Sequence, residues 1–400
     1  MTSQPTVQQD QREWIERARS LEPLVERQRD EAEQQRHLPL PLADAMRERG
    51  LFSLWLPKSL GGPELTIETS VLVMEELSRQ DGSVGWNSMI SGNHSILWAH
   101  VAHDTAAKMI EGGKKSIIAG TIGSGGTATA PGGGVATVVP GGYRITGQWP
   151  FASGCHHADW MVANGRISEN GELRKTPQGN VGLFSFLMSP SEVTLIDNWY
   201  TTGMRGTGSH DFEGENVFIP EDRVFSTNAP PMYEPSPLYT TGRTTPWSAN
   251  IAGVSLGIGR CAIDTFVDMA KSKPANMGRA TLMERETIHR GVGEAEGRLR
   301  SARAFLLETS RAVDAYIERG EDIPEDTCAL MRCAASTASL AAMEVCDSMF
   351  TMAGMTSTYS ASRLDRCFRD IHMVTQHVVG GLSGLTASGK FFMGLGLGQW

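Results

Sequence analysis

Two histidines near the end of the chain are the side chains best suited to acid–base chemistry at neutral pH. His372 and His377 follow Asp370 in the stretch RDIHMVTQHVVGG, where no carboxylate comes after the aspartate. An imidazole whose pKa is near 6.5 can take up or release a proton under these conditions. On one continuous helix Asp370 and His377 would share a face, while His372 would point about 140° away from His377, toward solvent or a neighbouring helix. At most one of the two histidines can therefore face a given pocket.

The spacing alone favours a structural role for His377. Gly380 and Gly381 form a stop signal typical of a helix C-terminus, where the helix dipole favours a protonated histidine. The dipole also raises the pKa of the ring, which opposes its use as a neutral base. A catalytic role therefore requires a pocket that offsets this effect.

Hydroxyl and aromatic side chains alternate in the segment WPFASGC, as Trp149, Phe151 and Ser153. Alternation of this kind places side chains on one side of an extended strand. A serine at a strand end can instead bond its own backbone, so a structural role for Ser153 stays open. The segment MRGTGSHDF adds further hydrogen-bond donors, of which the arginine is also suited to a structural role. These donors are Arg205, Thr207 and Ser209.

A third histidine lies among aromatic side chains in the amino-terminal part of the chain. His94 stands in SGNHSILWAH, with Trp86 before it and Trp98 after it. The two indoles could form the walls of a pocket for an aromatic molecule, or they could belong to the hydrophobic core. His94 is likewise either a site residue or a buried, hydrogen-bonded core residue.

The composition argues against several other kinds of function, and the sequence motifs of others are absent. The glycine-rich segment 123–134 fits neither the dinucleotide-binding nor the phosphate-loop spacing. The six cysteines show no CxxC pair, which indicates free thiols, predicts no metal site and favours the cytoplasm. A net charge of -9 without a basic run argues against nucleic acid and anionic membranes as partners. No apolar stretch has the length of a signal peptide or a membrane span.

The elements that would position these residues fall into three regions. Residues 1–118 and 236–400 show the periodicity of helices, whereas residues 119–235 are rich in glycine and in short β-type runs. A PGG sequence between two such runs predicts a tight hairpin within an antiparallel β domain. The last region carries a helical packing seam at seven-residue steps. Its members are Val292, Leu299, Leu306 and Val313.

Three blocks of sequence, spanning nearly the whole chain, resemble the acyl-CoA dehydrogenase family. LPLPLADAMRERGLFSLWLPKSLGGPELTIETSVLVMEELSRQDGSVGW (38–86) is similar to the family's amino-terminal helical domain. The others are APGGGVATVVPGGYRITGQWPFASGCHHADW (130–160) with GMRGTGSHDFEGENVFIPEDRV (203–224), and RLDRCFRDIHMVTQH (363–377). The resemblance implies an α+β, mainly α, acyl-CoA dehydrogenase-like fold. Its amino-terminal helical, middle antiparallel β and carboxy-terminal bundle domains would cover 1–118, 119–235 and 236–400.

The second and third blocks are similar to oxygenase relatives within this family. Those relatives are reduced-flavin-dependent hydroxylases of phenols and steroid-derived catechol precursors, and dibenzothiophene monooxygenases. A dehydrogenase needs a carboxylate base for the proton α to a thioester, and much of the family carries it just after the RD-containing helix. This chain has a histidine there. Because some dehydrogenases place the base on another helix, a flavin dehydrogenase and a non-catalytic assembly subunit remain alternatives.

The resemblance implies the oxygenase component of a two-component flavin-dependent monooxygenase. A separate NAD(P)H:flavin reductase would supply FADH2 or FMNH2. With O2, and through a C4a-hydroperoxide, the enzyme would hydroxylate or S/N-oxygenate an aromatic or heteroaromatic small molecule. Such chemistry calls for a water-poor pocket with a few hydrogen-bond donors. A homotetramer is also implied by the resemblance.

The resemblance also gives roles to individual residues. Ser153 is expected to face N5 or C4a of the flavin, and Trp149 and Phe151 are expected to flank the ring system. The expected catalytic residues are His377, His94 and Ser153. The expected cofactor-binding residues are Trp149, Phe151, Ser153, Arg205, Thr207 and Ser209. The expected substrate-binding residues are Trp86, His94 and Trp98.

Overall fold

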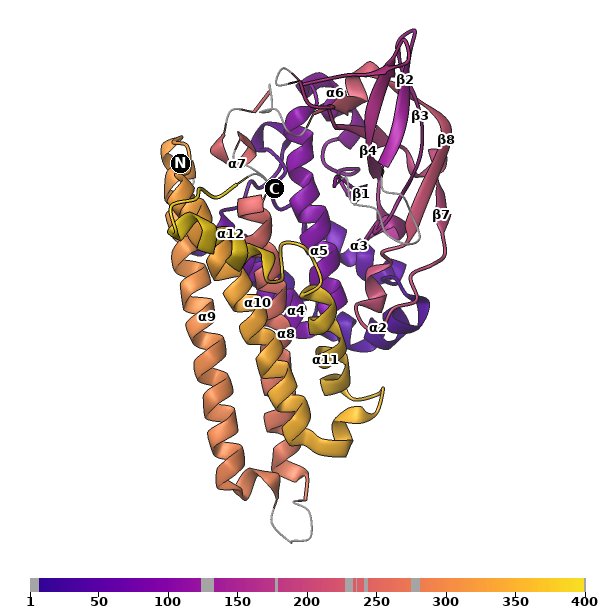
Figure 1. Cartoon of the computed structure of the whole chain (residues 1–400). Helices are drawn as coiled ribbons and strands as arrows, with labels where there is room; N and C mark the ends of the chain where they lie inside the picture. Colours follow the sequence, from indigo (N-terminus) through magenta and orange to yellow (C-terminus); the bar gives the residue numbers. More distant parts are fainter. Residues whose placement is uncertain are drawn as a thin grey trace, which may run out of the picture.

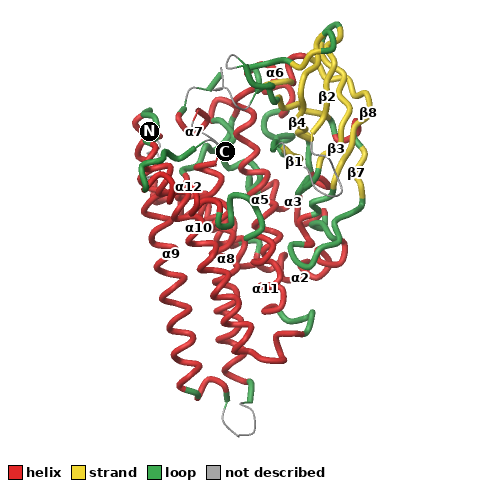
Figure 2. The backbone as a smooth tube through the Cα atoms, viewed as in Figure 1, coloured by secondary structure: helices red, strands yellow, loops and turns green. Residues whose placement is uncertain are grey.

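The structure, a computed structural model, describes residues 7–123, 133–176, 179–226, 233–234, 236–240, 244–274 and 281–398. Helices from both ends of the sequence pack into one body, and a β-sheet lies beside it (Figure 1). The predicted order of helical, β and helical regions is confirmed (Figure 2). The three domain boundaries stay predictions.

Helices form the amino-terminal region. They are α1 (Val7–Arg19), α2 (Glu22–Gln35), α3 (Leu40–Glu48), α4 (Ile67–Gln80), α5 (Gly82–His94) and α6 (His103–Ile110). The apolar run SVLVMEELSRQDGSVGW is divided between α4 and α5 by Asp81, whose backbone is extended. The Asp81 carboxylate accepts the backbone N–H groups of Ser83 and Val84, so it caps the start of α5.

One sheet forms the middle region. Its strands are β1 (Ile118–Thr121), β2 (Gly133–Val139), β3 (Gly142–Trp149), β4 (Trp160–Glu169), β5 (Glu172–Leu173), β6 (Phe184–Met188), β7 (Thr194–Ile196), β8 (Asp211–Pro220) and β9 (Val224–Phe225). The order is β7-β8-β3-β2-β4-β6-β9, with β1 and β5 also paired to β4. The predicted PGG hairpin is confirmed, because Val139 pairs with Gly142 and Gly141 takes a positive φ of 81°.

The sheet is mixed, so the prediction of a purely antiparallel domain was wrong in this respect. Both β1 and β2 run parallel to β4. After the β2–β3 hairpin the chain passes through residues 150–159 and adds β4 on the other side of β2. A connection of this length allows a parallel pairing, which a tight turn does not. Residues 150–159 thereby come to lie at the edge of the sheet that faces the helices, and they carry Ser153.

Long helices form the carboxy-terminal bundle. They are α7 (Pro237–Thr240), α8 (Thr244–Ser272), α9 (Glu286–Arg319), α10 (Glu325–Ala353), α11 (Arg363–Val374) and α12 (Ser383–Phe392). The predicted seam is confirmed on α9, where Leu299, Leu306 and Val313 are buried and Val292 is half-buried. Short 3-10 helices connect many elements: η1 (Lys58–Leu60), η2 (Ser95–His100), η3 (Cys155–His157), η4 (Pro190–Glu192), η5 (Arg205–Thr207), η6 (Glu221–Arg223), η7 (Leu282–Glu284) and η8 (Gly354–Thr358).

The amino-terminal helices and the bundle share one hydrophobic core, and a second core lies within the sheet. The close approach of α4 to α8 depends on Gly257, where a Cβ atom would lie 2.4 Å from the carbonyl oxygen of Glu75. Helix α5 packs against both α8 and β1, and it lies between the bundle and the sheet (Figure 1). Side chains of α5 can therefore meet residues from every other region.

Among the described helices, none combines the length and the apolar character that a bilayer span requires. All six cysteines are free thiols, as the absence of CxxC pairs predicted.

Candidate active site

Four segments meet between the sheet and the bundle: α5, the segment after β3, the segment before β8 and the turn after α11. Trp86 of α5 donates its indole N–H to the hydroxyl of Ser153 over 3.2 Å. The same indole ring lies edge-on to the ring of His377, with centroids 5.6 Å apart. Three residues predicted separately from the sequence are thus brought together. Trp86 connects them.

Three hydroxyl groups form a chain behind Ser153. Its Oγ atom lies 2.6 Å from that of Ser209, and the Ser209 Oγ lies 2.6 Å from the Oγ1 of Thr207. Thr207 in turn donates to the backbone carbonyl of Met204 over 2.8 Å. All three hydroxyl-bearing side chains are buried. The predicted cofactor-binding hydroxyls therefore form one connected network.

His377 lies in a turn, and the prediction that it shares a helix face with Asp370 was wrong. Helix α11 ends at Val374, after which Gln376 and His377 donate to carbonyls three residues back. The β-branched pair Val374–Thr375, and Gly380 and Gly381 further along, disfavour continuation of the α-helix. Asp370 consequently faces Met204, to which it bonds, whereas His377 faces Trp86.

The His377 ring is in its neutral form at pH 7. Although part of the ring edge reaches solvent, protein atoms surround it closely, and this burial lowers its pKa to about 4. Its Nδ1 accepts the backbone N–H of Val379 over 3.2 Å, so the ring proton resides on Nε2. His377 therefore presents an N–H donor. The pocket overcomes the helix-dipole effect that opposed a neutral ring.

His372 faces a neighbouring helix, as predicted. Its Nε2 lies 3.0 Å from a carboxylate oxygen of Asp347 in α10, and its ring packs edge-on against Phe368. Neither contact involves Trp86 or Ser153.

The aromatic residues around Ser153 divide into two groups. Phe151 is exposed, takes a positive φ of 64° and meets the ring of Trp199 edge-on. Trp149 is the last residue of β3, is fully buried and stacks on Phe212. The expected strand alternation thus ends at Trp149, and only Phe151 lies at the surface beside Ser153.

His94 and Trp98 lie away from this cluster. His94 is buried, with its Nδ1 3.2 Å from the carbonyl oxygen of Ile118 and its ring 5.6 Å from that of Trp247. Trp98 is fully buried and donates its indole N–H to the carbonyl of Ser116. His94 is the last residue of α5, and Trp98 lies in η2, which follows it. Their roles toward a substrate stay predictions.

A polar atom without a partner points to a ligand at this site. Within the described part of the chain, the buried Nε of Arg205 donates to no group. Arg205 begins η5, the 3-10 helix that also carries Thr207. A buried guanidinium N–H on the same short helix as Thr207 fits an oxygen- and nitrogen-rich ring system such as that of a flavin. The family resemblance implies that the glycine-rich segment 123–134 forms the flavin-facing rim of the β domain, and its residues 124–132 lie outside the described residues.

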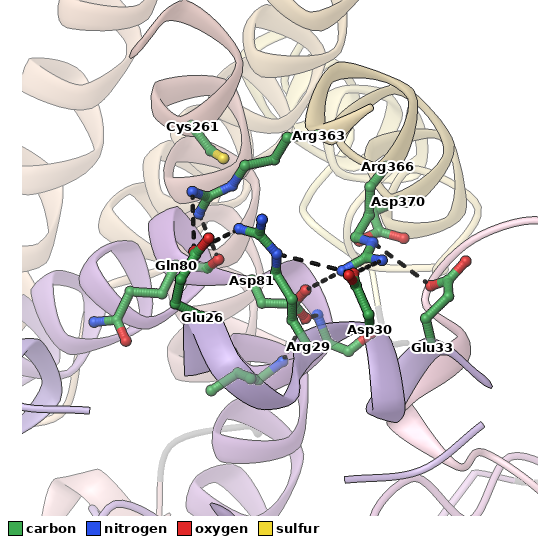
Figure 3. Close-up of polar contacts among 12 residues, drawn as sticks. Glu26, Arg29, Asp30, Glu33, Gln80, Asp81, Cys261, Arg363, Arg366 and Asp370 are labelled. Carbon is green, nitrogen blue, oxygen red and sulfur yellow. Dashed lines mark hydrogen bonds and ion pairs between the residues drawn. The ribbon is translucent and has the colours of Figure 1, made fainter. Parts of the chain in front are cut away.

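Helix α11 fixes the position of the segment before β8. The buried carboxylate of Asp370 accepts the backbone N–H of Met204 over 2.6 Å, and Met204 holds a left-handed φ of 51°. Burial and the nearby carboxylate of Asp81 raise the pKa of Asp370. Arginines of α11 reach the acidic side chains of α2 and the cap of α5 (Figure 3). They are Arg363, Arg366 and Arg369.

Two residues that hold the site together were not predicted from the sequence. Asn87 donates through Nδ2 to the carbonyl of Ser83 in its own helix and to that of Gly206 in η5. Trp199 donates its indole N–H to the carbonyl of Met204. Asn87 directly follows Trp86 in the sequence, and this was its one available signal. Trp199 stands among loop residues without periodicity.

Comparison with known proteins identifies the family of this chain. Residues 8–108 match the model for the amino-terminal domain of acyl-CoA dehydrogenases, and residues 249–380 match that for the carboxy-terminal domain. The chain is 30% identical to the indole-3-acetate monooxygenase of Pseudomonas putida, covering 94% of this chain and 93% of that protein.

Two further similarities extend over the whole chain. The chain is 28% identical to the oxygenase subunit HsaA of a flavin-dependent monooxygenase from Rhodococcus jostii, over 91% of this chain and 92% of that one. Its fold matches XiaF from Streptomyces sp., solved with FADH2 and glycerol, with a TM-score of 0.86, 25% identity and 97% coverage of each chain.

Proposed function

Since this chain belongs to the acyl-CoA dehydrogenase family, among its flavin-dependent monooxygenase oxygenase components, we propose that it oxygenates an aromatic molecule of the indole type. The predicted fold and the predicted function as an oxygenase component are confirmed at this level. The contact of Trp86 with both Ser153 and His377 carries the proposal, because it joins an aromatic wall to two polar groups.

The residues of this site fit a reduced flavin. We propose that Arg205 and the hydroxyls of Ser153, Thr207 and Ser209 hold the ring system, with Phe151 at its exposed side. When bound, a reduced flavin supplies the activation of O2 and the transfer of one oxygen atom to the substrate. A flavin of this kind is bound by XiaF, and reduced FAD is our preferred cofactor for this chain. Reduced FMN is the alternative.

Ser153 and His377 have different hydrogen-bonding roles at the site. We place Ser153 at N5 of the flavin, because its hydroxyl is buried and held by Trp86. His377, neutral with its proton on Nε2, donates a hydrogen bond toward oxygen or substrate. Ser153 is only 3% exposed, so little water reaches its hydroxyl. A donor role for His377 is favoured over that of a base, because its Nδ1 is occupied.

A dehydrogenase reaction is disfavoured by the position of the nearest carboxylate. Asp370 is the last carboxylate before Gly381, and it is buried against the Met204 N–H. No acidic side chain of this turn can reach a substrate beside Trp86. Among the described residues, the polar groups beside Trp86 are therefore hydrogen-bonding groups and include no carboxylate base.

The substrate and partners follow from the same premise. A planar aromatic ring suits the edge of Trp86, and the relative from Pseudomonas putida is named for indole-3-acetate. An oxygenase component implies a separate flavin reductase as partner. We further propose a cytoplasmic location, consistent with six free thiols, and a homotetramer.

The decisive experiment supplies reduced flavin from a separate NADH:flavin reductase to the purified protein with indole-3-acetate and related aromatic acids. We expect a product that carries one atom of ¹⁸O from ¹⁸O2. Ser153→Ala should divert most reduced flavin to hydrogen peroxide, with a loss of stability of no more than about 1–3 kcal/mol from the buried hydrogen bonds removed. Peroxide as the only product with every aromatic would contradict the proposal. Reduction of bound FAD by an acyl-CoA thioester would identify a dehydrogenase. A protein that binds neither the oxidised nor the reduced flavin would be an assembly subunit.

A further inference from the structure

The hydroxyl chain behind Ser153 has a direction that can be derived by counting protons. Thr207 donates to the carbonyl of Met204, which can only accept, so its single hydroxyl proton is committed. In the contact between Thr207 and Ser209, the donor must therefore be Ser209. The Ser209 proton is then committed too, and Ser153 must donate to Ser209.

The count leaves Ser153 with one open position. Its Oγ accepts the indole N–H of Trp86 and donates its proton to Ser209. A hydroxyl has one proton and two lone pairs, so a single lone pair remains unused. In this state Ser153 can accept a further hydrogen bond and has no proton to give.

The two redox forms of a flavin place opposite demands on such a hydroxyl. The N5 atom of a reduced flavin carries a proton and donates, whereas N5 of an oxidised flavin has a lone pair and accepts. Ser153, as the structure holds it, matches the donor of the reduced form. To serve the oxidised form it must withdraw its proton from Ser209, which breaks a hydrogen bond or reverses the chain.

We infer that Ser209 and Thr207 make the site selective for reduced over oxidised flavin by holding the proton of Ser153. This inference deepens the proposed function and rests on it. The two residues act through Ser153 and are positioning residues. An oxygenase that receives its flavin reduced and returns it oxidised needs such discrimination, because the spent form must leave before the next turnover.

The network is anchored firmly enough to keep this direction. The Met204 carbonyl also accepts the indole N–H of Trp199 and the backbone N–H of Thr207, so its position is fixed. The Met204 N–H is held by Asp370 on the other side. Ser153, Thr207 and Ser209 are each at most 3% exposed, so water does not compete for their protons.

The test measures dissociation constants of oxidised and reduced FAD and FMN, the reduced forms under anaerobic conditions. We expect the wild type to bind a reduced flavin more tightly than its oxidised form. Ser209→Ala frees the Ser153 proton, so it should tighten binding of the oxidised form about three- to tenfold, as for one neutral hydrogen bond. Selectivity falls by the same factor, and each tenfold loss lowers the two-electron potential of the bound flavin by about 30 mV.

Three further variants show whether the effect passes through Ser153. In a Ser153→Ala background, Ser209→Ala should leave selectivity unchanged, because no hydroxyl proton remains to be released. Thr207→Val removes the acceptor of the Ser209 proton and should also lower selectivity. Thr207→Ser keeps a hydroxyl and should restore it. A purely structural role would instead give additive losses for both flavin forms.

Failure of the inference is distinguishable from failure of the proposed function. Tight binding of reduced flavin with unaltered selectivity in Ser209→Ala overturns the inference alone, as does equal affinity of the wild type for both forms. Selectivity that responds as expected while no aromatic is oxygenated overturns the proposed substrate chemistry and supports the inference. Binding of neither form overturns both.

Discussion

At the scale of single residues, the state of His377 decides what chemistry it can perform. Burial lowers its pKa to about 4, and its Nδ1 is occupied by the Val379 N–H. A ring in this state can donate from Nε2 and cannot accept there. We therefore propose for His377 the role of a positioned donor, in place of the general base considered from the sequence, since oxygen-activating sites need such donors.

This assignment predicts a graded response to substitution of His377. His377→Ala should lower product formation about 10²-fold, with reduced flavin still consumed and recovered as peroxide. His377→Gln should recover part of this loss, because its amide can donate from nearly the position of Nε2. The measurement is product and peroxide per NADH oxidised. His372→Ala is the matched control, since its contacts are with Asp347 and Phe368, and coupling should stay intact. Equal, mild effects from both histidines would contradict the donor role.

A second histidine gives the protein an acid-sensitive position. His157 is buried against Phe52, and neither ring nitrogen has a partner in the described part of the chain. Burial lowers its pKa to about 3. The unfolded chain takes up a proton here below pH 6.5 and the folded chain does not, so this site contributes stability above pH 6.5 that is lost as the pH falls toward 3.

His157→Phe should therefore change the pH dependence of stability. At pH 5 the wild type should lose about 2 kcal/mol at this site relative to pH 7.5, and the variant should not. Urea unfolding at the two pH values measures the difference. The variant should gain stability over the wild type chiefly at the lower pH. A gain of the same size at both values would show that the ring of His157 is not neutral and buried as described.

At the scale of elements, the site depends on contact between α11 and the segment before β8. The ion pairs of α11 with α2 and with the cap of α5 bring these elements together (Figure 3). Helix α11 then contacts the segment that leads into η5: Asp370 bonds to Met204, and Arg369 lies against Gly203. A Cβ atom at Gly203 would lie 2.4 Å from the carbonyl oxygen of Arg369. The two backbones are therefore in direct contact, and no side chain fits between them.

Gly203→Ala should push this segment away from α11. Because the obstructing atoms are backbone, we expect a loss of stability of about 1–3 kcal/mol and a several-fold fall in coupling of flavin oxidation to product. Thermal unfolding and the product-to-peroxide ratio are the measurements. Gly297→Ala is the control, since nothing lies within 4 Å of its Cβ position on α9 and alanine favours a helix by up to about 1 kcal/mol. An unchanged coupling ratio in Gly203→Ala would show that the segment tolerates displacement.

At the scale of the whole molecule, periodicity predicted what lies within one element and missed what joins elements. The α9 seam and the PGG hairpin follow from local spacing and were found. The contact between Asp370 and Met204 joins residues 166 positions apart, and no local pattern records it. Ser153 and Trp86 were each selected, but the hydrogen bond between them was not foreseen. Trp98 and Trp149 are both fully buried, and their expected roles toward substrate and cofactor stay predictions.

The prediction of a homotetramer also concerns the whole molecule. The carboxy-terminal end exposes a group of large apolar side chains, including Leu382, Phe392, Met393 and Leu395, each more than half exposed. A monomer rarely leaves several such side chains together in water, whereas an interface between copies would cover them. Light scattering should therefore give a mass near four times 43.4 kDa.

Met393→Lys with Leu395→Lys, which adds two charges to that surface, should lower the mass to that of a smaller assembly. The thermal midpoint of the wild type should fall on dilution, because its subunits then separate. The midpoint of the variant should not change on dilution. A wild-type mass of 43.4 kDa at micromolar concentration would contradict the prediction, and the apolar end would then need another partner.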